Sequence, residues 1–333
     1  MKRISFILPC YNVERYIGAC LDSLYDQDLP MDAFEVICVN DCSTDRTREI
    51  IVSRQADCPN LILLDLPRNG YPGLARNKGM EVASGEYVWF VDSDDLLKPG
   101  VVKEVFREMD AESLDFLLFN FDEFRSDDPS LYIDRKDLYG SWPTDTGLAF
   151  LASHFNDNLR RVSLVWTCVF RRSFLQEYGL CFPDLCMSED SVFLWQAFFE
   201  AQSVKAVPDR FYVHRLNPSS IILGGLDARK SISCAFLFPD AIGKVIRKYE
   251  SRIPASLTEN LRRYQRHEAN LLGSRYLQLP AAERKKYYHY LRTHRDWYQQ
   301  FKGMLSRKNR LVYQVGLLGE RVFARMVQLL TKN

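Results

Sequence analysis

Short runs of apolar residues alternate with stretches of helical period along the first 121 residues of the chain. Because these apolar runs leave no polar face, they are typical of strands that are covered on both sides. The predicted strands are Ile4–Leu8, Phe34–Val39, Leu61–Leu64, Tyr87–Val91 and Phe116–Phe121, and the predicted helices are Glu14–Tyr25, Asp45–Gln55 (capped by Ser43 or Thr44), Pro72–Ala83 and Gly100–Asp110. The alternation predicts an α/β fold with a Rossmann-like, mostly parallel sheet and helices on both faces.

The pattern changes twice beyond residue 121. Residues 122–145 are polar and irregular, which indicates an insertion. Residues 146–222 return to a mixed α/β pattern, with a helix that begins at Glu189. After Gly224 the chain has a helical period and is rich in Lys, Arg and Tyr.

A chain of 333 residues is long for one compact domain. We expect a first domain over residues 1–222, with halves 1–121 and 122–222, and a basic helical C-terminal region over 223–333. The formal net charge is +1, which argues against nucleic acid as a partner, but residues 284–333 hold 12 Lys and Arg against 2 Asp and Glu. This imbalance favours contact with an anionic surface such as a phospholipid leaflet.

The cysteines and the apolar runs indicate a cytoplasmic protein. None of the nine cysteines forms a C-x-x-C pair, and Cys38 and Cys168 lie in apolar runs, so we expect thiols in a reducing compartment. The opening stretch MKRISFILPCYN reads as a first strand, since its apolar part is too short for a signal peptide. No run of 18 apolar residues predicts a membrane span.

Polar clusters follow three of the predicted strands, at Pro9–Asn12, Asn40–Asp45 and Asp92–Asp95. The carboxyl ends of parallel strands meet at one edge of a sheet, and ligands bind beyond that edge. The three clusters therefore predict a binding site.

The third cluster, Asp92-Ser-Asp94-Asp95, has two readings. A helix cap explains one of its carboxylates but not three. An EF-hand is excluded, because Leu96 and Leu97 stand where oxygen ligands are needed. An Asp-x-Asp pair at a strand end also suits Mg2+ or Mn2+ that bridges a diphosphate, so the cap and the metal site both remain open here.

The neighbouring residues fit a nucleotide. Asp41 follows a buried strand, where it is either a helix cap or an acceptor for the imide N–H of uracil. Arg76, in GLARNKG, is suited to a base carbonyl or a phosphate. Tyr11 is placed to stack on a base, although a tyrosine in this position is more often involved in simple packing.

The segments ILPCYNVERYI, VNDCSTDRT, RNGYPGLARNKGMEVASGEYVWFVDSDD and the later SED resemble a family 2 glycosyltransferase of the GT-A fold, of the type that acts in bacterial polysaccharide synthesis. The resemblance runs in order over about the first 220 residues. It implies an inverting transfer from a nucleotide sugar, most often a UDP-sugar, with a divalent metal. The acceptor it implies is a hydroxyl of a glycan or of a lipid-linked molecule.

The resemblance also implies roles for individual residues, which are Pro9, Tyr11 and Asp41 in the base pocket, Arg76 as a further nucleotide contact, Asp92 near the ribose and metal, Asp94 as the metal ligand proper, and Asp190 as the catalytic base. The halves 1–121 and 122–222 then become a nucleotide-binding and an acceptor half. The chain departs from the family at Cys42, where a glycine is usual, so the nucleotide edge is expected to be slightly reshaped.

Asp190 and its neighbour Glu189 have an alternative reading as an acidic first helical turn. General-base catalysis needs a single carboxylate near the acceptor hydroxyl, and Asp190 is our choice, with Glu189 orienting the acceptor or a loop. In YVHRLNPSSI, Arg215 is expected to pair with phosphate, whereas His214 is more often structural than a ligand of metal or acceptor.

The last segment, residues 311–329, carries an apolar stripe opposite Arg321 and Arg325. Such a helix either packs on its own domain or lies at a membrane interface, and we favour the membrane slightly.

Two other classes of protein are alternatives to a glycosyltransferase. A nucleotide-sugar-binding protein without catalysis would not need Asp92, Asp94 and Asp190 together. A sugar nucleotidyltransferase would need a Gly-rich basic loop after the first strand, and PCYNVERYI is neither.

Overall fold

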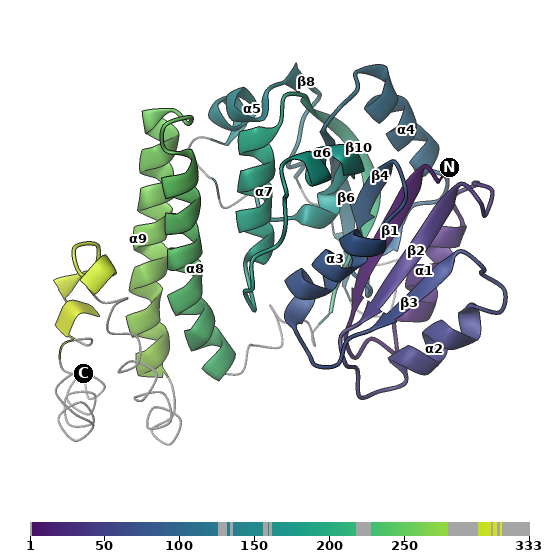
Figure 1. Ribbon diagram of the computed structural model, residues 1–333, viewed down its shortest axis with the longest axis horizontal. Helices are drawn as coiled ribbons and strands as arrows, with labels where there is room; N and C mark the ends of the chain where they lie inside the picture. Colours follow the sequence, from purple (N-terminus) through teal and green to yellow (C-terminus); the bar gives the residue numbers. More distant parts are fainter. Residues whose placement is uncertain are drawn as a thin grey trace. The chain divides into compact units, whose positions relative to one another are not determined.

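Figure 1 shows the computed structural model of the chain, which describes residues 2–125, 132–133, 136–155, 159, 162–217, 228–278, 299–307, 309–311 and 314. The chain separates into two compact units, Met1–Gly224 and Gly225–Asn333. The first is an α/β unit and the second is helical in its described part.

The first unit is built on a mixed sheet whose described strands are β1 (Ile4–Cys10), β2 (Phe34–Asn40), β3 (Leu61–Asp65), β4 (Tyr87–Phe90), β5 (Leu96–Leu97), β6 (Phe116–Arg125), β7 (Tyr132–Ile133), β8 (Trp142–Asp145), β9 (Cys168–Arg171) and β10 (Val204–Leu216). The main order is β3-β2-β1-β4-β9-β6-β10-β5. Strands β3, β2, β1 and β4 are mutually parallel, as are β6 and β10, whereas β9 runs antiparallel between β4 and β6. The predicted α/β fold with a mostly parallel sheet is confirmed.

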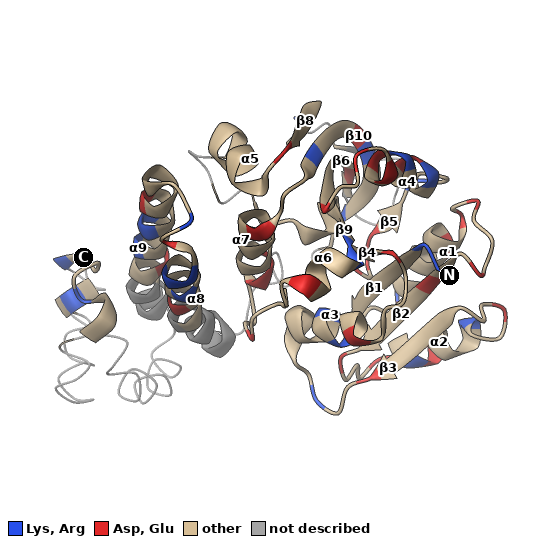
Figure 2. Cartoon of the chain, turned by 45° about the horizontal axis from the view of Figure 1, so that its top comes forward, with Lys and Arg blue, Asp and Glu red and all other residues tan. Residues whose placement is uncertain are grey.

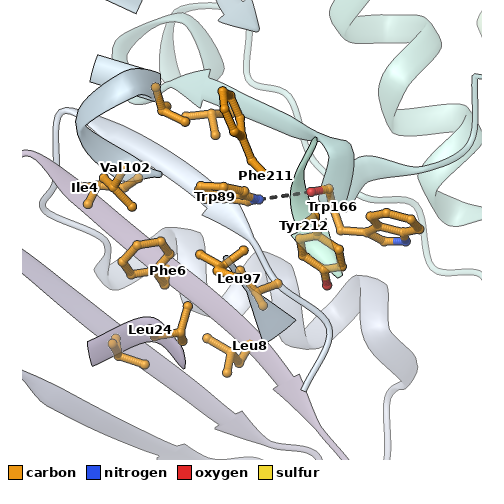
Figure 3. Close-up of a cluster of buried hydrophobic side chains, with 14 of the residues drawn as sticks. Ile4, Phe6, Leu8, Leu24, Trp89, Leu97, Val102, Trp166, Phe211 and Tyr212 are labelled. Carbon is orange, nitrogen blue, oxygen red and sulfur yellow. Dashed lines mark hydrogen bonds between the residues drawn. The ribbon is translucent and has the colours of Figure 1, made fainter. Parts of the chain in front are cut away.

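The described helices of this unit are α1 (Ile17–Tyr25), α2 (Thr47–Arg54), α3 (Tyr71–Val82), α4 (Val102–Ala111), α5 (Gly147–His154), α6 (Arg172–Glu177), α7 (Glu189–Glu200) and the 3-10 turn η2 (Val165–Thr167). They cover both faces of the sheet because β1 is apolar on both sides. Phe6 points into the core cluster with Leu24 of α1 and Val102 of α4 (Figure 3). Ile7 points to the other face, where a Cβ on Gly79 of α3 would lie only 2.3 Å from its side chain.

Two local predictions were wrong. Ser43 and Thr44 do not cap α2, whose first turn instead donates the Thr47 N–H to the Asp45 carboxylate over 3.0 Å. Strand β6 continues to Arg125, into the stretch predicted to be an insertion. Its polar end is stable as a strand because its side chains have partners on β10: Asp122 pairs with Arg210 at 2.9 Å, and Glu123 pairs with His214 at 3.1 Å.

The cysteines only partly match the prediction of buried thiols. Cys38 and Cys168 are buried and free, but Cys42 and Cys181 are exposed. Cys186 is disulfide-bonded, which corrects the expectation of thiols throughout. Its segment, PDLCMSED, contains no cysteine spacing that distinguishes it from a free thiol in the sequence.

The described part of the second unit contains the long helices α8 (Ala228–Tyr249) and α9 (Ala255–Gln278). Leu257 and Leu261 of α9 are buried, whereas Arg262, Arg263 and Arg266 are exposed. Lys and Arg recur along this helix (Figure 2). Among the described residues no helix is long and apolar enough to cross a membrane. The predicted membrane-facing stripe over 311–329 falls almost wholly outside the described residues.

Candidate active site

The three polar clusters meet at the carboxyl edge of β1, β2 and β4, as their positions after parallel strands predicted. The Asn12 N–H donates to Ser43 Oγ over 3.1 Å, and Asn12 Oδ1 accepts the Thr44 N–H over 2.8 Å. Ser93 Oγ donates to the Pro9 carbonyl over 2.7 Å. The loops after the three strands are thus joined by hydrogen bonds into one continuous surface.

The turn Asp92–Asp95 exposes two of its carboxylates and buries the third. The Asp95 N–H donates to the Asp92 carbonyl over 3.0 Å and closes the turn. Asp92 and Asp94 are half-buried, but Asp95 is 1% exposed. The Asp95 carboxylate accepts the Tyr212 hydroxyl at 2.9 Å and the Arg215 N–H at 2.7 Å. The third carboxylate of the cluster therefore holds the turn to β10, a role that the sequence did not distinguish from the others.

Asp94 lies within the turn and is contacted by two residues from the end of β10 and just beyond it. Asn217 Nδ2 donates to its Oδ2 over 3.1 Å, and Arg215 Nε donates to its main-chain carbonyl over 2.8 Å. Burial, and then the negative charge of Asp92, raise the pKa of the Asp94 carboxyl above its ordinary value. A cation that arrived between the two carboxylates would relieve this repulsion.

The residues fit a metal that is shared with a ligand, not one enclosed by protein. Among the described residues no three His, Cys, Asp or Glu side chains form a ready metal cluster. Mg2+ is commonly held by one or two carboxylates together with phosphate oxygens. Asp92 and Asp94 supply such a pair of hard oxygen donors on the surface of the turn.

Arg76 joins the Asp92–Asp95 turn to α7. Its guanidinium is 3% exposed and lies 2.8 Å from Asp92 Oδ1, 3.0 Å from Glu189 Oε1 and 2.7 Å from Asp190 Oδ1. Burial opposes its charge, but the three carboxylates outweigh burial and raise the pKa of Arg76. The sequence predicted a nucleotide contact for Arg76, and that contact remains a prediction beside this observed role as a bridge.

Asp190 and Glu189 occupy the first turn of α7 but differ in depth. The Glu189 side chain is 8% exposed, and a Cβ on Gly73 of α3 would lie 3.0 Å from its Cγ. The Asp190 side chain is 16% exposed and accepts the Val165 N–H. Burial raises the pKa of the Asp190 carboxyl well above its ordinary value, although the Arg76 charge opposes that shift. A carboxylate that is largely buried but still partly accessible, with a raised pKa, is suited to accept a proton.

The predicted base pocket lies at the ends of β1 and β2. Tyr11 is 45% exposed, which leaves its ring open to a ligand. Asp41 is 2% exposed, and its Oδ1 accepts the Gly70 N–H over 2.7 Å, just before α3 begins at Tyr71. Asp41 thus caps α3 and not the helix that follows it in sequence, and burial raises the pKa of its carboxyl. Roles for Pro9, Tyr11 and Asp41 toward a base remain predictions.

The end of β10 contributes side chains that the sequence only partly identified. His214 Nδ1 lies 3.1 Å from Glu123 Oε1, and its ring stacks on Trp166 at 5.1 Å between centroids. The Arg215 guanidinium lies over Tyr16 and Phe124, at 5.0 and 4.5 Å from the ring centroids. Its contact with phosphate therefore remains a prediction. Ser220, near the end of the segment YVHRLNPSSI, lies outside the described residues.

Four residues of the site were not predicted, namely Glu123, Trp166, Tyr212 and Asn217. Each acts through a partner that is distant in sequence, so no local motif marks it. The available signal was that charged residues interrupt apolar runs, as Glu123 and His214 do.

The comparisons with known proteins agree with this geometry. Residues 5–179 match the sequence profile of the family described as "Glycosyl transferase family 2". The chain is 33% identical over 223 residues to the putative glycosyltransferase EpsH of Bacillus subtilis strain 168, a match that covers 66% of this chain and 62% of EpsH. It is 32% identical over 218 residues to the poly(ribitol-phosphate) beta-N-acetylglucosaminyltransferase TarS of Staphylococcus aureus, covering 64% of this chain and 35% of TarS.

Solved structures share the fold. Residues 1–349 of S. aureus TarS in complex with UDP superpose with a TM-score of 0.63 at 23% identity, covering 99% of this chain and 91% of that one. The mannosyltransferase PcManGT from Pyrobaculum calidifontis, in complex with GDP-Man and Mn2+, gives a TM-score of 0.54 at 17% identity, covering 99% and 88%. The family profile covers more than half of the chain, so this protein belongs to glycosyl transferase family 2, with the GT-A fold.

Proposed function

We propose that the protein is an inverting, metal-dependent glycosyltransferase that moves a sugar from a UDP-sugar to a hydroxyl of a glycan or lipid-linked acceptor. The observation that carries this proposal is the Arg76 bridge. One buried guanidinium lies 2.8 Å from Asp92 and 2.7 Å from Asp190. Asp92 is the proposed contact on the donor side, and Asp190 is the candidate base. A carboxylate for the leaving group and one for the acceptor are thereby held in one rigid unit.

The nucleotide would bind over β1 and β2. The half-exposed ring of Tyr11 offers a stacking surface to the base. Asp41 has one oxygen engaged with the Gly70 N–H, and the uracil imide N–H would donate to this carboxylate. Uracil is preferred to guanine on the strength of the UDP-bound relative.

Asp92 and Asp94 would hold Mg2+ or Mn2+. When bound, the metal supplies positive charge that neutralises the departing diphosphate. The chain's own contribution is to hold the two carboxylates of the turn in place, through Arg76 on Asp92 and Asn217 on Asp94. Arg215 lies beside this turn, where its Nε donates to the Asp94 carbonyl, and its positive charge would favour the diphosphate there.

Asp190 would act on the acceptor. Its carboxylate takes the proton of the acceptor hydroxyl while that oxygen attacks the anomeric carbon from the face opposite the diphosphate. The bond between the anomeric carbon and the diphosphate oxygen breaks, its electron pair leaves with UDP, and the anomeric configuration inverts. The proton remains on Asp190, whose raised pKa favours that outcome.

The acceptor is inferred from a relative, and the cellular location is inferred from the charge of the chain. TarS is named for a poly(ribitol-phosphate) acceptor, which favours a cell-surface polymer. The basic residues of 284–333 favour a cytoplasmic protein that binds the membrane surface peripherally. We assign catalysis to residues 1–222, with the nucleotide bound by 1–121 and the acceptor by 122–222.

The proposal is tested by UDP release from a panel of UDP-sugars, with GDP- and dTDP-sugars alongside. We expect slow hydrolysis of a UDP-sugar that requires Mn2+ and is abolished by EDTA. Asp94→Asn should remove this release. The matched control is Asp115→Asn. Asp115, like Asp94, accepts hydrogen bonds from amide groups, in its case the main-chain N–H groups of Gln202 and Ser203. It precedes β6 and therefore lies at the opposite edge of the sheet.

Release that persists in EDTA would overturn the metal dependence. A protein that neither releases nor binds any nucleotide, with or without Mn2+, would overturn the transferase.

A further inference from the structure

The Asp92–Asp95 turn is held by a strand that lies far away in sequence. The Tyr212 hydroxyl of β10 accepts the Asp92 N–H over 3.0 Å and donates to Asp95 Oδ2 over 2.9 Å. One hydroxyl therefore closes both ends of the turn, with Asp94 between them. The Arg215 N–H, three residues on, holds the second oxygen of Asp95 at 2.7 Å.

The Tyr212 ring has little freedom to move. It is fully buried and stacks on Trp166, with ring centroids 4.7 Å apart and an interplanar angle of 23°. The Trp166 carbonyl in turn accepts the indole N–H of Trp89 in β4 over 3.0 Å (Figure 3). The ring is thus fixed from β4, the strand that leads into the turn.

Burying a carboxylate beside two others is costly, and here the cost is offset by the hydrogen bonds that hold Asp95 to β10. Asp95 is 1% exposed and lies next to Asp94. An uncharged amide could also close a turn, but it has a single acceptor oxygen and could not give a separate, charged oxygen to each of the two donors from β10. The arrangement is typical of partners that orient the ligands of a metal from behind.

We propose that Asp95 and Tyr212 are positioning residues, which set the separation and direction of the Asp92 and Asp94 carboxylates before the cation and diphosphate bind. This assignment rests on the proposed function and deepens it. Neither residue touches the substrate; each acts through the geometry of the turn. Without the hydroxyl, the Asp92 N–H and the Asp95 carboxylate would lose a shared partner, and the turn would relax.

The test compares two buried tyrosines of one sheet. Tyr87 is also fully buried, and its hydroxyl also donates to a carboxylate, that of Asp110, but it stands at the amino end of β4, away from the turn. Tyr87→Phe and Tyr212→Phe each remove a hydroxyl that donates to a carboxylate, although Asp110 is more exposed than Asp95. Both should lower Tm by a few degrees.

Only Tyr212→Phe should weaken Mn2+ binding in the presence of UDP, by about 10-fold or more, as measured by the EPR signal of free Mn2+. UDP affinity without metal should stay close to that of wild type. Should Tyr212→Phe fail to fold, Asp95→Asn takes its place, because the amide keeps the shape and one acceptor oxygen for the Arg215 N–H. It should weaken Mn2+ binding similarly.

Three results decide the assignment. Mn2+ affinity within twofold of wild type in Tyr212→Phe, or an equal loss in Tyr87→Phe, would overturn the positioning role while the proposed function stands. A wild-type protein that binds neither UDP nor Mn2+ would overturn both. Weakened Mn2+ binding confined to Tyr212→Phe and Asp95→Asn supports the assignment.

Discussion

Asp190 is subject to two opposing influences. Burial raises the pKa of its carboxyl, while the Arg76 guanidinium at 2.7 Å lowers it, and the balance is upward. Arg76 favours the carboxylate form of Asp190, which a general base needs, while burial favours the form that has taken the proton. Since Arg76 also pairs with Asp92, a change at the donor side would alter the charge that Asp190 feels.

Asp190→Asn should separate catalysis from binding. The substitution keeps the shape but removes the charge and the basic oxygen, so turnover should fall by about 100-fold or more. UDP-sugar affinity should change far less than turnover, because Asp190 reaches the donor side only through Arg76. Kinetics and calorimetry on one preparation measure both quantities, with Asp115→Asn as the matched control.

The pH profile provides a second readout of the same prediction. The active form is the carboxylate, so wild-type turnover should decrease as the pH falls through the raised pKa of Asp190, and the variant should lack this limb. Near-normal turnover in Asp190→Asn would place the base elsewhere, with Glu189 and His214 as the next candidates.

At the scale of elements, the loops of the site contain several residues with a left-handed backbone. Asn12, Cys42, Tyr71 and Ser188 have φ between 53° and 64°, and each lies in a loop or at the start of a helix beside the site. Such conformations cost L-residues about 1–2 kcal/mol each and persist where the surrounding structure holds them. The usual glycine of the family at position 42 is explained by this φ of 63° at Cys42.

Cys42→Gly should therefore stabilise the protein. Relief of the left-handed backbone outweighs the added freedom of glycine in the unfolded chain, which leaves a gain of about 0.5–1 kcal/mol in the free energy of unfolding. Cys181 is also exposed and free but has no positive φ, so Cys181→Gly should destabilise. Urea unfolding measures both variants, and a loss of stability in Cys42→Gly would contradict the argument.

The strands could be predicted from the sequence because their apolar runs are buried on both faces. β1 to β4 lie within two residues of the predicted bounds. The prediction failed where polar residues continue a strand, as in β6, whose Glu123 is paired with His214 of β10. It also failed at helix caps: Asp41 caps a helix 29 residues further on, a pairing that only the folded sheet creates.

The same limit applied to the site. Asp92, Asp94 and Asp190 stand in local motifs and could be named in advance. Tyr212 and Asn217 could not, because they reach the turn through the register of β10. Strand order across the antiparallel β9 is not encoded in any short segment.

For the molecule as a whole, positive charge is concentrated toward the C-terminal end of the chain. Residues 284–333 carry 12 basic against 2 acidic residues, and the exposed face of α9 adds Arg262, Arg263 and Arg266. Counterions alone would satisfy such charges, but an anionic bilayer would bind them more tightly.

The intact protein should co-sediment with vesicles of phosphatidylglycerol and phosphatidylcholine, but not with vesicles of phosphatidylcholine alone. Binding should weaken strongly as salt is raised, since screening reduces the attraction. Equal binding to both kinds of vesicle, or insensitivity to salt, would contradict an electrostatic membrane contact.

The bond between Asp95 and Tyr212 spans 117 residues of chain, which has a consequence for synthesis on the ribosome. At about 5–20 residues per second, the turn is made roughly 6–23 s before the strand that holds it. During this interval the nascent chain carries Asp94 and Asp95 without their later partners Tyr212, Arg215 and Asn217. The first four parallel strands can assemble in that time, but the proposed cation site would gain its final geometry only when β10 is inserted beside β6.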